Sequence, residues 1–188
     1  MFNHDILLLD IEATGLDVTR HEIIQLAAIL LDKKTLKEKK NFSSYAKPKK
    51  WENREPEAMA VNGISWDSLK NAPSLTTVLK KFNQQFPKDC IPTNYGGNLD
   101  VIFLSAAYRE SKVKYPFDYH TFNMWALCYT YMAIEKRLDS RLKFPGFGLD
   151  DIAKHFNIKI PSSRHDALAD CRLEAEVLKK VVKNFGKK

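Results

Sequence analysis

Two carboxylates one residue apart follow a short apolar segment near the N-terminus. Residues 6–9 are all apolar, Asp10 and Glu12 come next, and Thr14 and Gly15 then indicate a turn. On an extended chain, residues 10 and 12 face the same side, and their charges repel unless protons or cations neutralise them. Mg²⁺ and Mn²⁺ are hard cations that prefer such oxygen ligands. The pair therefore indicates either a metal site or two solvated acids at the end of a strand.

Another acid follows a pair of glycines in the middle of the chain. Asp100 lies four residues after Gly96, at the start of an apolar pattern that predicts a helix beside the end of a strand. Asp100 is therefore expected in the first turn of this helix. The simpler interpretation is an acid that complements the dipole of the helix in its first turn.

A histidine and an aspartate lie five residues apart near the C-terminal end. This spacing does not stack His165 directly above Asp170 on a helix. Both side chains can still reach one cavity if His165 lies at the helix entry and Asp170 lies inside the helix. The alternative is an exposed histidine at a helix end, followed by ordinary surface acids.

The elements that position these residues follow from hydrophobic periodicity and turn signals. Three strands come first, and a tight turn joins the second to the third. Shorter strands then alternate with helices, of which two have Ser74 and Asn98 as expected N-caps. This order predicts an α/β fold with a mixed sheet flanked by helices. The expected strands are residues 6–9, 22–31, 36–45, 91–95 and 119–123, and the expected helices are residues 55–61, 75–86, 99–111, 124–138, 149–156 and 164–184.

Length and composition predict one globular domain spanning residues 1–188. The chain is 44% hydrophobic and 28% charged, and no stretch approaches the ~20 apolar residues of a membrane span. Its N-terminal segment lacks the features of a signal peptide. Cys90, Cys128 and Cys171 form no C-x-x-C motif, so neither a disulfide framework nor a cysteine zinc site is expected. These features predict a cytoplasmic protein with reduced thiols.

The formal net charge of +7 favours a polyanionic partner. Basic residues are concentrated in residues 33–50 and at the C-terminal end. A solvated hairpin and a solvated tail would give the same pattern, so charge alone does not identify nucleic acid as the partner.

The ordered combination of motifs resembles the DEDDh family, the DnaQ-like 3′→5′ exonucleases. The family motif D-x-E-x-T-G matches residues 10–15, H-x-A-x-x-D matches residues 165–170, and Asp100 fits the Asp near a helix start. Residues 56–79 also resemble the family stretch around N-G-I and A-P-S, so the resemblance runs from about residue 6 to residue 178. Two positions depart from it. Asn123 stands where many members carry an Asp that is not a metal ligand, and Ala169 stands where an acid often precedes the last Asp.

The resemblance implies a ribonuclease H-like fold, with a five-stranded mixed sheet and helices on both faces. It also implies that Asp10, Glu12, Asp100 and Asp170 hold two divalent ions, Mg²⁺ or Mn²⁺, which together clamp the attacking and leaving oxygens. His165 would take a proton from the attacking water as general base. The expected reaction removes nucleoside 5′-monophosphates from the free 3′ end of single-stranded DNA or RNA.

The same resemblance suggests which residues contact the substrate. Thr14, Gly15 and Leu16 follow the first motif and would face the terminal nucleotide, where backbone N–H groups can reach the 3′-hydroxyl. A second group borders the last base in the family and would hold unstacked bases. For two of its members, Met59 and Ile64, a place in the hydrophobic core is an equally reasonable interpretation. The members of this group are Met59, Asn62 and Ile64.

Three other functions are compatible with the same motifs. The chain could be the proofreading subunit of a DNA polymerase, or an oligoribonuclease that trims RNA. A catalytically silent nucleic-acid-binding module is the alternative from a different class. It is disfavoured because all five catalytic-type residues are present.

Overall fold

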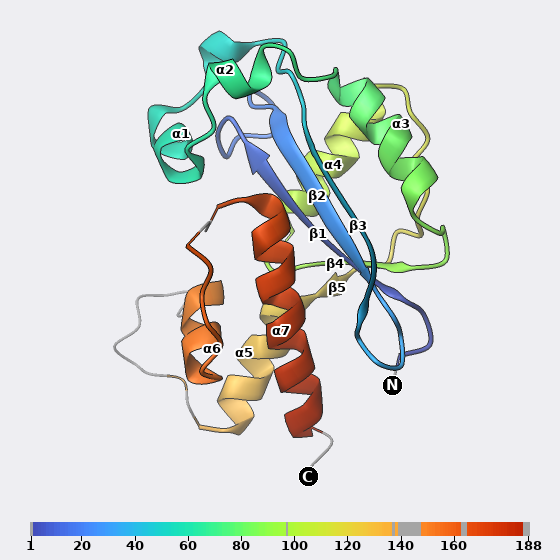
Figure 1. Cartoon of the computed structure of the whole chain (residues 1–188), viewed down its shortest axis with the longest axis vertical. Helices are drawn as coiled ribbons and strands as arrows, with labels where there is room; N and C mark the ends of the chain where they lie inside the picture. Colours follow the sequence, from blue (N-terminus) through green and yellow to red (C-terminus); the bar gives the residue numbers. More distant parts are fainter. Residues whose placement is uncertain (1, 97, 137, 139–147, 163–164, 186–188) are drawn as a thin grey trace.

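A five-stranded sheet forms the centre of the protein. The computed structural model describes residues 2–96, 98–136, 138, 148–162 and 165–185. The strands are β1 (Ile6–Ala13), β2 (Ile23–Leu31), β3 (Glu38–Tyr45), β4 (Ile91–Asn94) and β5 (Phe122–Asn123), in the order β3-β2-β1-β4-β5 (Figure 1). β2 pairs antiparallel with β1 and β3, whereas β4 pairs parallel with β1 and β5. The predicted mixed sheet is confirmed.

Helices cover both faces of this sheet. α3 (Leu75–Gln85) and α4 (Leu99–Glu110) lie on one side, and α5 (Met124–Ile134), α6 (Leu149–His155) and α7 (Ala167–Phe185) lie on the other (Figure 1). The short elements η1 (Trp51–Asn53), α1 (Pro56–Asn62) and α2 (Trp66–Leu69) lie beyond the ends of β1 and β2. None of the described helices has the length and hydrophobicity needed to cross a membrane.

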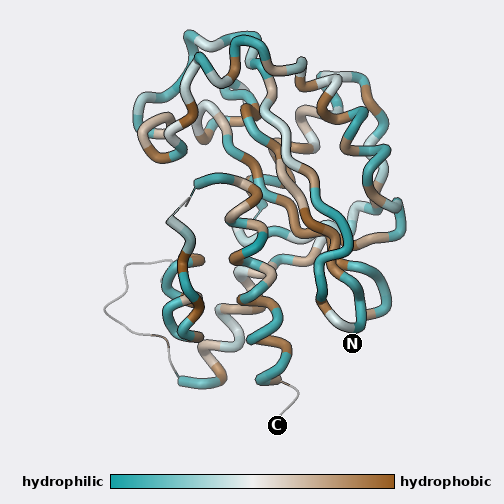
Figure 2. The backbone as a smooth tube through the Cα atoms, in the orientation of Figure 1, coloured by the Kyte–Doolittle hydropathy of each residue, from teal (hydrophilic) through white to brown (hydrophobic). Residues whose placement is uncertain are grey.

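The two-faced core follows from the alternation of side chains along a strand. Ile6 and Leu8 of β1 belong to the cluster beneath α5, α6 and α7, whereas Leu7 and Leu9 belong to the cluster beneath α3 and α4. All four are fully buried. Figure 2 shows the hydrophobic central strands and the hydrophilic β2–β3 hairpin loop near the N-terminus. The buried strand therefore fixes the position at which Asp10 and Glu12 leave the core.

Several element boundaries differ from the sequence prediction for local reasons. α7 begins at Ala167 because His165 has φ 64°, outside the right-handed helical region. α5 stops at Ile134, and Lys136 just beyond it adopts φ 53°, a common way for helices to end. β5 has only two residues, which pair with Thr93 and Asn94 of β4. η1 and α2 were not predicted, because a single turn is too short to show a period.

The expected caps were right at one helix and wrong at another. Ser74 accepts a hydrogen bond from the backbone N–H of Thr77 and caps α3 as predicted. Asn98 makes no side-chain capping bond at α4. Asn123, noted only as a departure from the family pattern, caps α5 by accepting from the N–H of Ala126 at 2.9 Å.

Candidate active site

The end of β1 presents the first two acids, as the sequence predicted. Asp10 pairs across the sheet with Ala27, and Glu12 pairs with Gln25. Oδ2 of Asp10 is buried and accepts no hydrogen bond from the described part of the chain. A buried carboxylate oxygen without a donor is costly unless another group neutralises it.

Asp100 reaches the same place from the first turn of α4 and is buried there. Its Oδ2 accepts from Nδ2 of Asn94, at the end of β4, at 2.9 Å. The nearby backbone amide of Ile11 lowers the pKa of this carboxyl, so α4 and β1 meet at Asp100. An added Cβ at Gly96 would lie 2.8 Å from Oδ2, so a glycine is needed where the chain passes Asp100 so closely.

His165 and Asp170 complete the group from the start of α7. The backbone N–H of His165 donates to Oδ2 of Asp170 at 3.2 Å, and this contact folds the histidine back over the helix start. Glu12, His165 and Asp170 each offer a ligand atom, and these atoms lie within 4.8 Å of one another. His165 lies outside the helix, and its backbone is in the left-handed conformation. For this reason, side chains five residues apart can reach one site.

Gln25 of β2 holds the start of α7 in this position. Its Nε2 donates to Oδ2 of Asp166 at 3.0 Å, and its Oε1 accepts from the N–H of Ala167 at 3.3 Å. Gln25 is buried and lies opposite Glu12 in the sheet register. Gln25 was not among the residues predicted for the site. A single polar residue inside the apolar run of β2 was the available signal.

The site is strongly acidic. Burial raises the pKa of Asp10 well above its ordinary value, and repulsion from Asp100, Glu174, Glu12 and Asp170 raises that pKa further. Burial also raises the pKa of Asp100, although the hydrogen bond from Asn94 opposes this. Acids that raise one another's pKa in this way are those that a bound cation would stabilise as anions.

Glu174 is a fifth carboxylate that the sequence analysis did not single out. It lies one helical turn after Asp170 and is 2% exposed. Its Oε1 accepts from the N–H of Tyr95 at 3.2 Å, next to the Asn94 that binds Asp100. Glu174 therefore links the helix that carries Asp170 to the strand end that positions Asp100. Its i+4 spacing from Asp170 was the signal that could have found it.

The turn after β1 places the predicted contact residues differently. Thr14 is 1% exposed, and its Oγ1 accepts from the N–H of Glu22 at 3.0 Å, so its side chain holds the turn, and its contact with a nucleotide stays a prediction. Leu16 is 71% exposed and lines a cleft beside the acids. Gly15 lines the same cleft. The conformation that exposes Leu16 depends on Thr14, whose hydroxyl and backbone hold the turn.

Of the other three predicted contact residues, one lines the same cleft and two do not. Asn62 lines it, and its Nδ2 donates to the carbonyl of Ala13 at 3.3 Å. Ile64 is instead buried in a small core cluster with Ile24, and Met59 packs against this cluster. Neither Met59 nor Ile64 is among the residues that line this cleft, and their contact with the last base stays a prediction. Leu16, Ala58, Val61 and Leu99 form the apolar wall.

We expect Gly15→Ala to destabilise the protein. An added Cβ would lie 2.5 Å from Cε1 of His21, closer than a real Cβ contact allows. The imidazole cannot easily move, because Nδ1 accepts from the N–H of Asp17 at 2.9 Å and Nε2 lies 3.5 Å from Oε1 of Glu55. Overpacking of this kind costs about 1–3 kcal/mol and should lower the Tm by roughly 2–10 °C in a thermal melt.

Gly148→Ala is the matched control for this prediction. Its added Cβ would meet only Oδ2 of Asp151, at an ordinary 3.9 Å. An equal loss of Tm in both variants would show that backbone freedom, and not the His21 ring, determines the effect at Gly15.

The carboxylates of the site fit divalent metal ions. The donor set is dominated by oxygen, which suits Mg²⁺ or Mn²⁺, and the buried Oδ2 of Asp10 lacks any donor among the described residues. Glu12, His165 and Asp170 are close enough to share one ion. Asp10, Glu12, Asp100 and Asp170 are the residues that could hold such ions, with His165 beside them.

Comparison with known proteins agrees with this geometry. Residues 7–178 match the RNase_T family, described as exonucleases. A relative from Aquifex aeolicus, the DNA polymerase III subunit epsilon, is 29% identical over 186 residues, which cover 95% of this chain and 81% of that protein.

Solved structures share the fold at low sequence identity. Cell-death related nuclease 4 superposes with a TM-score of 0.81 and 18% identity, covering 97% of this chain and 64% of that one. The nuclease domain of 3′hExo, a DEDDh family member solved with bound rAMP, gives a TM-score of 0.75 and 21% identity, covering 96% and 92% of the two chains. The predicted ribonuclease H-like fold is confirmed.

Proposed function

Because the chain belongs to the RNase_T exonuclease family, as its DEDDh-type motifs predicted, we propose that it removes nucleoside 5′-monophosphates from the 3′ end of single-stranded nucleic acid. The observation that carries this proposal is the convergence of three motifs. β1 brings Asp10 and Glu12, α4 brings Asp100, and the start of α7 brings His165 and Asp170. The adjoining cleft supports the approach of a nucleotide from the Leu16 side.

A DEDDh-type exonuclease depends on divalent metal, and the donor set described above suits it. We propose that Asp10, Glu12, Asp100 and Asp170 hold two ions, Mg²⁺ or Mn²⁺. When bound, such ions neutralise charge on the scissile phosphate and make a nearby water more acidic. The hydrogen bond from Asn94 keeps Asp100 directed at the site.

His165 is the proposed general base. Its backbone is held to Asp170 by the N–H bond at 3.2 Å, while its side chain remains exposed beside Glu12. An imidazole suits proton transfer near neutral pH, because its ordinary pKa is about 6.5. The proton that it accepts from water is then released to solvent, which reaches this exposed side chain.

Labelled oligomers test the proposed polarity. We expect free 3′ ends to be digested one mononucleotide at a time and a 3′-phosphate to block digestion. Blunt duplex should be cut more slowly than single strand, because terminal bases must separate to enter the cleft. The measurement is gel analysis of 5′-labelled DNA and RNA oligomers of the same sequence, with and without EDTA. Internal cuts in circular single strands, or full digestion in excess EDTA, would exclude the proposal.

A proofreading role is the second candidate, and the epsilon-subunit relative is the observation that favours it. A proofreading enzyme should prefer a mismatched primer terminus to a matched one, because a mismatch frees the 3′ end. An RNA-trimming enzyme should instead degrade short RNA at least as fast as DNA. Rates on these substrates, measured side by side, separate the two roles.

A further inference from the structure

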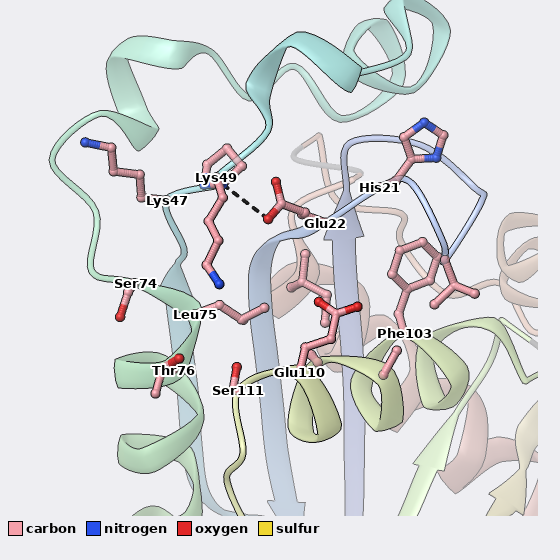
Figure 3. Close-up of a pocket in the computed structure, with 15 residues that line it drawn as sticks. His21, Glu22, Lys47, Lys49, Ser74, Leu75, Thr76, Phe103, Glu110 and Ser111 are labelled. Carbon is pink, nitrogen blue, oxygen red and sulfur yellow. Dashed lines mark hydrogen bonds between the residues drawn. The ribbon is translucent and has the colours of Figure 1, made fainter.

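A basic surface beside α1 takes no part in the site described above. Lys47, Lys49 and Lys50 follow β3 and are exposed, and Arg54 follows η1. Within the described part of the chain, none of these four cations forms an ion pair. The segment itself is fixed, because the carboxylate of Glu22 accepts from the backbone N–H of Lys49 at 3.2 Å (Figure 3) and from the backbone N–H of Lys50 at 2.7 Å.

Two tryptophans lie among these cations. The rings of Trp51 and Trp66 have centroids 5.4 Å apart and are tilted by 37°. Trp51 is half-buried against the small core cluster that contains Ile64, whereas Trp66 is 38% exposed. Nζ of Lys47 lies 5.8 Å from the centre of Trp66, and Cζ of Arg54 lies 4.9 Å from the centre of Trp51. We call this surface, formed by Lys47, Lys49, Trp51, Arg54 and Trp66, the Trp–Lys patch.

Its chemistry matches single-stranded nucleic acid. An exposed indole with nearby ammonium and guanidinium groups offers a stacking surface for a base and cations for phosphates. Stacking of a base on an aromatic ring contributes about 1–3 kcal/mol. An exposed cation–π contact contributes only about 0.5–1 kcal/mol. A base can therefore replace Lys47 over Trp66, and Lys47 is then free to pair with a phosphate.

The patch is joined directly to the candidate active site. Arg54 precedes Glu55, whose N–H donates to the carbonyl of Thr14 at 2.7 Å, and Glu55 itself lines the cleft. α1 follows at once and contributes Ala58 and Val61 to the cleft wall. The patch residue Arg54 and the cleft residue Glu55 are therefore neighbours in the chain, so a strand whose 3′ end occupies the cleft can continue toward the patch.

We propose that the Trp–Lys patch is a second binding site for the single-stranded substrate, contacting nucleotides 5′ of the one that is removed. The proposal rests on the proposed function and adds a length preference to it. Oligomers long enough to reach the patch bind more tightly than dinucleotides. The patch acts on phosphates and base faces, so it does not select a base sequence.

The test compares substrates of two lengths in patch variants. Anisotropy of a 5′-labelled 12-mer in EDTA measures binding without cleavage, and hydrolysis with Mg²⁺ or Mn²⁺ is then compared for the 12-mer and a dinucleotide. Trp66→Ala should weaken 12-mer binding at least about fivefold and raise its KM similarly. Trp66→Phe should restore most of the loss, because it keeps a ring. Dinucleotide kcat/KM should be unchanged in both variants.

The double variant Lys47→Ala/Lys49→Ala tests whether these two lysines bind phosphates of the strand. Each lost phosphate contact should reduce the slope of log affinity against log salt by about 0.7 for a single strand. Tyr129→Ala is the matched control, since Tyr129 lies on α5 and is 37% exposed, like Trp66. It should leave both substrates unaffected. A Trp66→Ala protein that fails to fold would leave the lysine variant to decide.

The outcomes separate the two proposals. If the patch variants keep the 12-mer affinity, the KM and the salt slope of the parent, the proposed second binding site is overturned. This outcome is also the one expected if the patch binds a protein instead of the substrate. A parent protein that hydrolyses neither substrate would overturn the proposed function. Its affinity for the 12-mer would still report on the patch.

Discussion

Replacing Asp10 by alanine should reduce cleavage at least about a thousandfold while leaving the fold intact. A metal ion at such a site stabilises the transition state by several kcal/mol, and each 1.36 kcal/mol corresponds to a tenfold change in rate. Asp10 lies among the other acids, and charge from Asp100, Glu174, Glu12 and Asp170 raises its pKa. Single-turnover rates on a 3′-labelled oligomer measure the effect.

The same variant should be more stable than the parent in chelator at neutral pH. The pKa of Asp10 is raised in the folded protein, so between its ordinary value of 3.8 and the raised value the folded state binds more protons than the unfolded state. The parent therefore loses stability as pH rises through that window. The variant lacks this loss, and its advantage should vanish below about pH 4. Thermal melts in EDTA from pH 3.5 to 8 measure the difference.

Metal should reverse the order of stability. Ligands that bind only the folded state stabilise it, so Mn²⁺ should raise the Tm of the parent more than that of Asp10→Ala. Asp89→Ala, an exposed acid just before β4, is the control and should behave like the parent in both conditions. A variant that unfolds in chelator would make Asp10 a structural residue and remove the argument for its catalytic role.

Much of this site was predictable because its motifs are local. Asp10 and Glu12 were placed by strand alternation, and Asp100 was placed by its position after β4. The residues that hold these acids in place come from elsewhere in the chain. Gln25 and Glu174 contact residues that lie 142 and 79 positions away in the sequence. The local signals, a polar residue in an apolar strand and an i+4 spacing, mark these two residues but do not show which partners they meet.

The substrate-contact residues were harder to predict because sequence does not show which way a side chain points. Thr14 and Ile64 lie in the expected segments, yet both are buried. Leu16, two residues after Thr14, is exposed. The turn after β1 and the single-turn elements η1 and α2 set these directions. Such short elements lack a period, so their exposed and buried sides appear only in the folded structure.

His165→Asn isolates the proposed general base. Loss of a positioned base costs about 10²–10⁴-fold in rate, so kcat should fall within that range. Asparagine is the informative replacement because His165 has φ 64°, and asparagine tolerates this left-handed conformation better than alanine does. The backbone N–H bond to Asp170 needs no side chain and should persist. His165→Ala adds backbone strain, and a lower Tm in that variant alone would measure it.

Two other roles for His165 make different predictions. Its ring lies within 4.8 Å of carboxylate oxygens of Glu12 and Asp170, so it could ligate metal directly. In that case Mn²⁺ affinity should fall together with kcat, whereas a general base leaves affinity almost unchanged. A cationic contact to phosphate would instead make substrate binding tighter at low pH, because imidazolium carries the charge.

The pH dependence of the rate decides among these roles. In the parent, single-turnover rates should fall as acid protonates the base, because imidazolium cannot accept a proton from water. The His165→Asn protein should lose this acid limb and keep only the dependence that the carboxylates and the bound ions impose. Rates and Mn²⁺ affinities from pH 5.5 to 9 provide the comparison. An asparagine variant within about threefold of the parent throughout this range would remove His165 from the proton transfer, since a positioned base contributes far more than that.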